Sequence, residues 1–313
     1  MKKYYLLPLF LLFLTISFSQ KKKNTNDGLK SSDLSGLKFR SVGPAFMSGR
    51  IADIAINPEN ENEWYVAVGS GGVWKTVNSG TTWKAITDDQ DFYSTGCITI
   101  DPHNSSKIWL GTGENVGGRH VGIGHGVFVS DNGGKSWKSM GLKSSEHISK
   151  IIVSPKDPNI VFVASQGPLW SSGGERGLYR TDNGGKTWKN VLSVNEWTGV
   201  TDIAIDHNNP NILYAATWQR HRNVASYMGG GPGTSIYKST DHGITWTEIK
   251  NGLPSSNLGK IGLAISPFDS SILYAAVETD RRNGAVYKTT NSGGSWKKMS
   301  DTVSGATGPH YYQ

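Results

Sequence analysis

The chain has 313 residues, and its 32 Lys and Arg against 25 Asp and Glu give a formal net charge of +7. Five of the lysines lie within the first 23 residues, where there is no acidic residue, so removing these five from the 32 leaves 27 basic residues and a net charge of +2. This distribution argues against a nucleic-acid partner. The 39 Gly, 11 Trp and 12 Tyr, in a chain that is only 36% hydrophobic, exclude a helical bundle and a disordered tail and indicate an all-β protein.

The single cysteine, Cys97, excludes an internal disulfide framework and a cysteine-based structural zinc site. It lies in a strand-like apolar run, so we expect it to be buried as a small apolar side chain. No sequence pattern of a catalytic cysteine surrounds it.

Residues 1–20 have the layout of a secretory signal peptide. Two lysines precede an apolar run from about Leu6 to Phe13, and small and polar residues follow it. This run is shorter than the roughly 20 residues of a spanning helix, so we expect no membrane span after cleavage of the signal. Residues 21–36 are polar and charged and are expected to be a flexible leader. The sequence therefore predicts a secreted or periplasmic protein.

An eight-residue pattern, which we call the octet, recurs five times. Its copies are TVNSGTTW (76–83), SDNGGKSW (130–137), TDNGGKTW (181–188), STDHGITW (239–246) and TTNSGGSW (289–296). Each copy has a hydroxyl residue at its first and seventh positions, Asn or Asp third, Gly fifth and Trp eighth, and the tryptophans are 54, 51, 58 and 50 residues apart. An Asn or Asp side chain can accept hydrogen bonds from backbone amides, and Gly adopts a positive φ without strain. Each octet is therefore predicted to form a hairpin turn.

Every octet lies within the same series of four strand-like runs. In the first repeat these runs are IADIAINP, EWYVAVG, GVWKT and TWKAI, with the octet between the third and the fourth. Four antiparallel strands in about every 50 residues are typical of the blades of a β-propeller. The fold class predicted is an all-β propeller within residues 37–313, with five complete blades at 50–86, 96–141, 148–192, 200–250 and 260–299.

Two further segments concern how the propeller closes. Residues 37–43 (LKFRSVG) match a fourth strand, with Phe39 in the position of the octet tryptophan, and are expected to be an N-terminal outer strand that completes the last blade. Residues 300–313 resemble the start of a further blade. We therefore expect the five blades to be part of a larger propeller.

The octets match the Asp-box, or bacterial neuraminidase repeat, whose pattern is Ser/Thr-x-Asp-x-Gly-x-Ser/Thr-Trp, and the match extends over residues 37–300. Asp-box propellers include sialidases, xyloglucan-cleaving glycoside hydrolases, the sortilin (VPS10-type) receptor propeller and photosystem II assembly-factor-like proteins. With FRSVGPAFMSGRI near its start and GTGE at 111–114, the chain most resembles secreted bacterial repeat proteins that are sortilin-like and glycosyl-hydrolase-like.

The resemblance implies that the octets are structural and carry no catalytic carboxylate. Asn replaces Asp in four of the five octets, and because the amide keeps the acceptor oxygen, the turn is expected to be kept. The residues expected to be structural in this way are Asn78, Trp83, Asn132, Trp137, Asn183, Trp188, Asp241, Trp246, Asn291 and Trp296.

The connections between the second and third strands of the blades, the B–C loops, are expected on the face opposite the octets, which we call the loop face. They are long in blades 2, 3 and 4 (114–126, 166–177 and 219–234), and variable loops on a rigid scaffold concentrate binding residues. Arginines with aromatic neighbours can bind carboxylates and sugars, which predicts an acidic or sugar-like ligand. The candidate ligand-binding residues are Glu114, Asn115, Arg119, His120, Trp170, Arg176, Arg220, Arg222, Tyr227 and Arg281.

Two catalytic alternatives follow from the resemblance. A sialidase-like site needs three converging arginines, a tyrosine nucleophile and a helping Glu, and FRSVGP at 39–44 only echoes the arginine motif of those enzymes. A xyloglucanase-like site needs two facing carboxylates, roughly 6.5–9.5 Å apart for an inverting reaction. Such relatives carry one Asp just before a glycine pair at the end of a second strand, where this chain has Gly69 and Ser70. The remaining catalytic candidates are Glu114 and Glu278, both at the end of a second strand.

The sequence thus favours a secreted binding module that recognises a protein, a peptide or a glycan on its loop face, with a glycoside hydrolase as the alternative. No cofactor is expected. The loop histidines His120, His125 and His221 match no compact metal-ligand spacing, so no metal site is predicted.

Overall fold

The computed structural model describes residues 30–37, 49–118, 120–280 and 283–300. The chain divides into two units, residues Met1–Phe46 and Met47–Gln313. The predicted signal peptide, positions 38–43 of the predicted closing strand and the segment after Ser300 lie outside the described residues.

The helices of the described residues are two short 3-10 helices. The first unit contains η1 (Ser31–Leu34), and the second contains η2 (Lys143–Ser145), which lies between blades 2 and 3. In this part of the chain no helix is long and apolar enough to cross a membrane.

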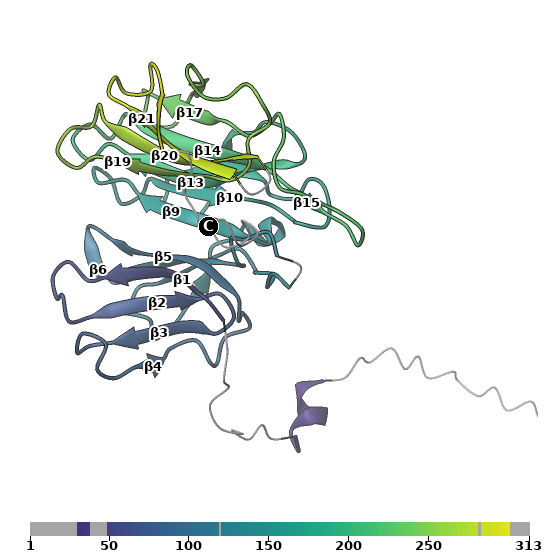
Figure 1. Cartoon of the computed structure of the whole chain (residues 1–313). Helices are drawn as coiled ribbons and strands as arrows, with labels where there is room; N and C mark the ends of the chain where they lie inside the picture. The colour runs from purple at the N-terminus through teal and green to yellow at the C-terminus, as the bar shows by residue number, and fades with distance from the viewer. Residues whose placement is uncertain (1–29, 38–48, 119, 281–282, 301–313) are drawn as a thin grey trace, which may run out of the picture. The chain divides into compact units, whose positions relative to one another are not determined.

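The second unit is built from five four-stranded antiparallel sheets, each of which uses its strands in their order along the chain (Figure 1). These sheets, blades 1 to 5, confirm the predicted all-β propeller class. Their strands are β1 (Ile51–Ile56), β2 (Trp64–Val68), β3 (Gly72–Thr76) and β4 (Lys84–Ala85) in blade 1; β5 (Thr95–Asp101), β6 (Asn104–Thr112), β7 (Val127–Ser130) and β8 (Lys138–Ser139) in blade 2; β9 (Ile148–Val153), β10 (Val161–Ser165), β11 (Gly177–Thr181) and β12 (Lys189–Leu192) in blade 3; β13 (Thr198–Ile205), β14 (Leu213–Gln219), β17 (Ile236–Ser239) and β18 (Thr247–Glu248) in blade 4; and β19 (Ile261–Ile265), β20 (Leu273–Asp280), β21 (Asn283–Thr289) and β22 (Lys297–Ser300) in blade 5. A two-stranded hairpin of β15 (His221–Arg222) and β16 (Tyr227–Met228) is inserted in the B–C loop of blade 4.

The first strands of the blades, β1, β5, β9, β13 and β19, lie next to one another and form the inner edge of the blades. We call them the inner strands. The hydrophobic core lies between consecutive blades: Tyr65 and Val73 of blade 1, for example, pack with Ile98 and Leu110 of blade 2. Because both faces of a middle blade are covered, a strand such as β10 is buried along its whole length and apolar as far as Ala164. Cys97 is 1% exposed between blades 2 and 3, which confirms its expected burial.

The octets form the predicted turns. In blade 1 the Asn78 side-chain oxygen accepts a hydrogen bond from the Thr82 amide at 2.9 Å, and the Thr76 hydroxyl accepts one from the Gly80 amide at 3.0 Å. The same two bonds recur in the other four octets. The exchange of Asp for Asn therefore leaves the turn intact, because the bonds need only an acceptor oxygen at the third position.

The octets also attach each blade to the blade before it. The Lys75 ammonium of blade 1 donates to the Gly133 carbonyl of the next octet at 3.3 Å. The Tyr65 hydroxyl, which donates its proton to Glu63 at 2.6 Å, lies 3.4 Å from the same carbonyl. The Trp188 indole of blade 3 donates to the Met140 carbonyl of blade 2 at 2.7 Å. An octet is thus both a turn and a contact between blades.

The fifth octet position requires glycine for two reasons. Its φ lies between +77° and +87° in all five copies, a conformation that strains other residues. In blades 3 and 4 it also approaches an aromatic ring of the preceding blade: a Cβ at Gly185 would lie 2.9 Å from the Trp109 ring, and one at Gly243 would overlap the Phe162 ring.

The two end blades expose positions that are buried in the middle blades. Ile54 of blade 1 is 52% exposed, whereas the equivalent Ile98 of blade 2 is 3% exposed. Tyr274 of blade 5 is 41% exposed, whereas the equivalent Tyr214 of blade 4 is buried. No other blade covers these two faces in the described residues, which agrees with the expectation that the five blades are part of a larger propeller.

Candidate binding site on the loop face

A β-bulge occurs at the same repeat position in four of the inner strands. A bulge inserts one residue that the partner strand does not match, and it redirects the side chains beside it. The bulged residues Ala52, Gly96, Ser149 and Thr201 all line one cavity of about 340 Å³. We call this cavity, which residues of all five inner strands line, the axial pocket.

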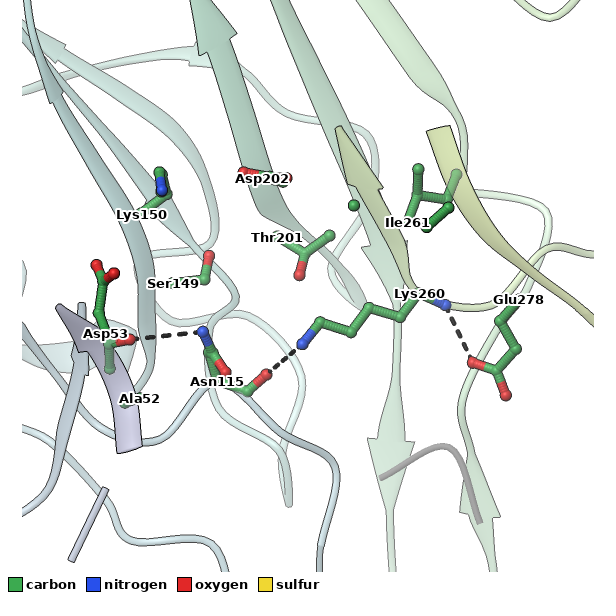
Figure 2. Close-up of a pocket in the computed structure, with 13 residues that line it drawn as sticks. Ala52, Asp53, Asn115, Ser149, Lys150, Thr201, Asp202, Lys260, Ile261 and Glu278 are labelled. Carbon is green, nitrogen blue, oxygen red and sulfur yellow. Dashed lines mark hydrogen bonds between the residues drawn. The ribbon is translucent and has the colours of Figure 1, made fainter. Parts of the chain in front are cut away.

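Charged side chains from four blades line the axial pocket. They are Asp53 of β1, Lys150 of β9, Asp202 of β13, and Lys260 and Glu278 of blade 5. In Figure 2, Asp53 and Lys150 stand on one side, Lys260 and Glu278 on the other, and Asp202 between them. Apart from Glu278, the sequence analysis missed these residues, because they occupy ordinary strand positions that only the bulge distinguishes.

The two aspartates of the axial pocket tie neighbouring blades together. The Asp53 carboxylate accepts hydrogen bonds from its own neighbour Ile54 at 2.9 Å and from the Ile98 amide of blade 2 at 3.0 Å. The Asp202 carboxylate accepts in the same way from Ile203 at 2.9 Å and from the Leu263 amide of blade 5 at 2.7 Å. Burial raises the pKa of Asp202, although these two N–H groups and nearby lysines oppose the rise. Both carboxylates therefore hold backbone amides.

The B–C loop of blade 2 reaches across to blades 4 and 5. Its residues 115–117, which we call the strap, present three successive backbone carbonyls to three cations. Lys260 Nζ donates to the first carbonyl at 2.9 Å, Arg220 Nη1 to the second at 2.9 Å and Arg222 Nη2 to the third at 3.0 Å. The strap is thereby fixed against two blades that are remote from it in sequence.

Three arginines that were predicted to bind a ligand on the loop face are buried. Arg176, Arg220 and Arg222 are 4%, 0% and 3% exposed. Burial lowers the pKa of Arg176 to about 10 and that of Arg220 to about 9. Their expected exposure to a ligand is corrected, because a buried guanidinium needs acceptors and these three find them in loop carbonyls rather than in solvent.

Arg176 organises the B–C loop of blade 3 from within. Its guanidinium donates to the carbonyls of Gln166 at 2.7 Å and Pro168 at 2.5 Å, and to the Trp197 carbonyl of the next blade at 3.2 Å. The fork of five donors in a guanidinium suits this task, since one side chain can satisfy several carbonyls that point in different directions.

Glu114 is 2% exposed, and its carboxylate holds the B–C loop of blade 2 onto blade 1. It forms an ion pair with Arg50 and accepts hydrogen bonds from the Gly122 amide at 2.9 Å and the Ser70 hydroxyl at 3.4 Å. Its Oε1 fills the space that a Cβ of Gly69 would need. The Glu114 carboxylate therefore lies beside the position where xyloglucanase-like sequences were expected to carry their Asp.

The two predicted catalytic carboxylates do not share the axial pocket. Glu278 lines it, and Glu114 is not among its lining residues. Glu278 accepts a hydrogen bond from the Lys260 backbone amide at 3.2 Å. Burial and the nearby Arg220 lower the pKa of the Lys260 side chain to about 8, against the opposing effect of Asp202 and Glu278.

The other candidate ligand residues are more accessible. Trp170 is 44% exposed, and His120 is exposed with its ring nitrogen 3.2 Å from a guanidinium nitrogen of blade 1. Tyr227 is half-buried, with the Arg222 guanidinium 4.4 Å from its ring centre. Asn115 belongs to both the strap and the axial pocket. The candidates Arg119 and Arg281 lie outside the described residues.

Glu146, between blades 2 and 3, is a further residue that the sequence analysis missed. Its backbone has φ +60° and ψ −30°, which is strained for a residue other than glycine. Burial raises the pKa of its carboxyl, against the opposing charges of Arg220 and Arg176. Nothing in the sequence marks this strain, because the φ of one loop residue depends on contacts made by distant loops.

No protein family model matches the chain. Among curated proteins it is 28% identical over 258 residues to a xyloglucanase of Hypocrea jecorina and 30% identical over 259 residues to xyloglucanase Xgh74A of Acetivibrio thermocellus. Each match covers 71% of this chain, which spans 28% of the length of either relative.

Solved structures show the same fold at lower identity. The GH74 enzyme of Niastella koreensis is 17% identical, with a TM-score of 0.62 over 80% of this chain and 38% of that one. YCF48 bound to D1 peptide is 16% identical, with a TM-score of 0.52 over 83% of this chain and 70% of that one. The chain therefore has GH74 xyloglucanase-like and YCF48-like propeller relatives, whereas the sortilin-like resemblance stays a prediction.

Proposed function

We propose that this chain is a secreted or periplasmic propeller module that binds a glycan across its loop face without cleaving it. The observation that carries the proposal is the strap, because two buried arginines and the half-buried Lys260, from two other blades, hold its carbonyls in place. A loop surface that is fixed before binding loses little conformational entropy when a ligand arrives. The names of the curated relatives, xyloglucanases, favour a glycan over a peptide as the ligand class.

The state of Glu114 argues against hydrolysis. A general acid must be protonated and must reach the glycosidic oxygen, and the second carboxylate must face it across the scissile bond. Glu114 is buried and ion-paired with Arg50. The other candidate, Glu278, lines the axial pocket beside Lys260, and Glu114 is not among the residues that line this pocket. A bound glycan would therefore remain intact.

The test is a titration of the protein with xyloglucan oligosaccharides by isothermal calorimetry, followed by an assay for new reducing ends. We expect saturable binding and no release of reducing ends. Trp170→Ala should weaken binding severalfold, since a sugar ring loses its apolar contact with an exposed aromatic side chain, which is worth on the order of 1 kcal/mol. Trp83→Ala is the matched control, because Trp83 is 40% exposed against 44% for Trp170 but belongs to an octet.

Two results would overturn the proposal. Reducing ends that appear with the wild type and vanish with Glu114→Gln or Glu278→Gln would identify a glycoside hydrolase, the alternative that the relatives' names favour. Saturable binding of an unrelated peptide, with none of the oligosaccharides, would identify a peptide-binding propeller instead.

A further inference from the structure

The carboxylates in the wall of the axial pocket already accept hydrogen bonds from the protein itself. Both oxygens of Asp53 and both oxygens of Asp202 accept a backbone N–H group. The Ser149 hydroxyl shares its single proton between the Ala164 and Val200 carbonyls at 3.3 and 3.1 Å, so it can meet a ligand only as an acceptor. Among these side chains, the acceptors left for ligand hydroxyls are therefore the Ser149 oxygen and the second lone pairs of the carboxylates.

Donors in the same wall are open. The Lys150 ammonium makes no hydrogen bond and no ion pair with any described residue, although it lines the pocket. The Thr201 hydroxyl accepts from Gln166 Nε2 at 3.2 Å, and within the described residues its own proton has no acceptor. The Asn115 side-chain amide makes a single long bond of 3.5 Å to the Gly96 carbonyl, so it has a further N–H to offer.

We propose that the axial pocket binds a small hydroxylated carboxylate of the hexuronate type. The Lys150 ammonium is the ion-pair partner of the carboxylate, and the Thr201 hydroxyl and the Asn115 amide are hydrogen-bond donors. The Asn115 side-chain oxygen, which accepts no hydrogen bond from a described residue, suits a ligand hydroxyl. This site shares Asn115 with the strap, but it lies inside the axial pocket, and the binding of a single sugar acid there does not depend on the binding of a glycan to the loops.

The charge of the wall disfavours a dianion more than a monoanion. Asp53, Asp202 and Glu278 carry three negative charges. Against them stand the two positive charges of Lys150 and Lys260, which leaves a formal net charge of −1. A doubly charged phosphate therefore meets about twice the net Coulomb repulsion that a carboxylate meets. Direct contact with the Lys150 ammonium is what opposes this repulsion for a carboxylate. A volume of about 340 Å³ lies near the lower end of the roughly 300–1,000 Å³ of ligand pockets, which fits one sugar ring rather than a chain.

Calorimetric titrations of the full chain at pH 7 and low salt test the proposal with three probes: D-glucuronate, D-glucose and inorganic phosphate. We expect glucuronate to bind, and glucose, which has the same ring without the carboxylate, to bind at least about tenfold more weakly. Phosphate should also bind more weakly. Equal affinity for glucose, stronger binding of phosphate or no binding of glucuronate would overturn the proposal.

Two variants separate the site from the fold. Lys150→Met should weaken glucuronate binding roughly tenfold to a hundredfold with only a small fall in melting temperature, because the ammonium makes no internal hydrogen bond or ion pair with a described residue and contributes only its charge near Asp202. Thr201→Val, which keeps the side-chain shape, should weaken it less. Lys186→Met, at an exposed octet lysine, is the control and should change nothing. Unchanged affinity in Lys150→Met, or an equal loss in Lys186→Met, would contradict the assignment.

Discussion

The octet face and the loop face are held together by different kinds of contact. On the octet face, each blade repeats the same two turn hydrogen bonds. On the loop face each contact is used once: Arg176 holds its own loop, Arg220 links three blades, and Glu114 pairs with Arg50.

This difference separates stability from specificity. A contact that recurs in every blade stabilises the stack of blades, but it does not make one blade different from another. A ligand needs a unique arrangement of side chains, so binding belongs where the repeat is broken. Variants on the octet face should therefore change stability without changing ligand binding, whereas variants on the loop face should change the order of the loops as well as stability.

The largest effect is expected at Arg220. Arg220→Ala removes the donors to the Val116 and Gly167 carbonyls and leaves a cavity in the loop layer. We expect the free energy of unfolding to fall by about 3 kcal/mol, with faster proteolysis in the B–C loops. Urea denaturation measures the first and limited trypsin digestion the second. A loss below about 1 kcal/mol would show that the strap does not depend on this side chain.

A smaller loss is expected at the fifth position of an octet. Gly243→Ala puts a Cβ into the Phe162 ring and also strains a backbone with φ +77°. It should cost about 2 kcal/mol, against about 1 kcal/mol for Gly173→Ala, where φ is +70° and no atom lies within 4 Å of the added Cβ. Thermal unfolding of the two variants measures both losses, and their difference is the contribution of the packing of one blade on the next. Equal losses would mean that the octet glycine serves only the turn.

The next expected effect depends on pH. The Lys260 side chain has a native pKa of about 8, below its ordinary 10.5, because of burial first and of Arg220 second. Between these two values the unfolded chain binds more protons than the native one, so the contribution of Lys260 to stability rises with pH from about 8 to about 10.5. The difference in urea midpoint between wild type and Lys260→Met should therefore change between pH 7 and pH 9.5. A difference in urea midpoint that is the same at both pH values would show that Lys260 has the pKa of a solvent-exposed lysine.

The smallest effect is expected at the third position of an octet. In the wild type the Asn132 side-chain N–H donates to the Ser136 hydroxyl. In Asn132→Asp the hydroxyl would instead donate to the carboxylate, as the Thr245 hydroxyl of blade 4 donates to Asp241 at 2.5 Å. The free energy of unfolding should change by less than about 0.5 kcal/mol, because hydroxyl groups can reverse their role. A larger change in chemical denaturation would show that the two octet types are not equivalent.

The octet face could be predicted from the sequence in detail, because an octet is local. Asn78, Gly80 and Thr82 lie within five residues, and turn chemistry fixes their bonds. The loop face could be located only as a region. Long side chains such as Arg220 were expected to face solvent, and the structure buries them under loops of other blades. Contacts between residues more than 100 positions apart, such as Arg220 with Val116, leave no local sequence pattern.

Hydrogen–deuterium exchange with and without xyloglucan oligosaccharides tests most directly whether the loop face is the binding surface. We expect slower exchange on addition of the oligosaccharides in residues 166–177 and 219–234, with no change in the five octets. Slower exchange in the octets, or no change in these loops at a saturating concentration, would contradict the division between a structural face and a binding face.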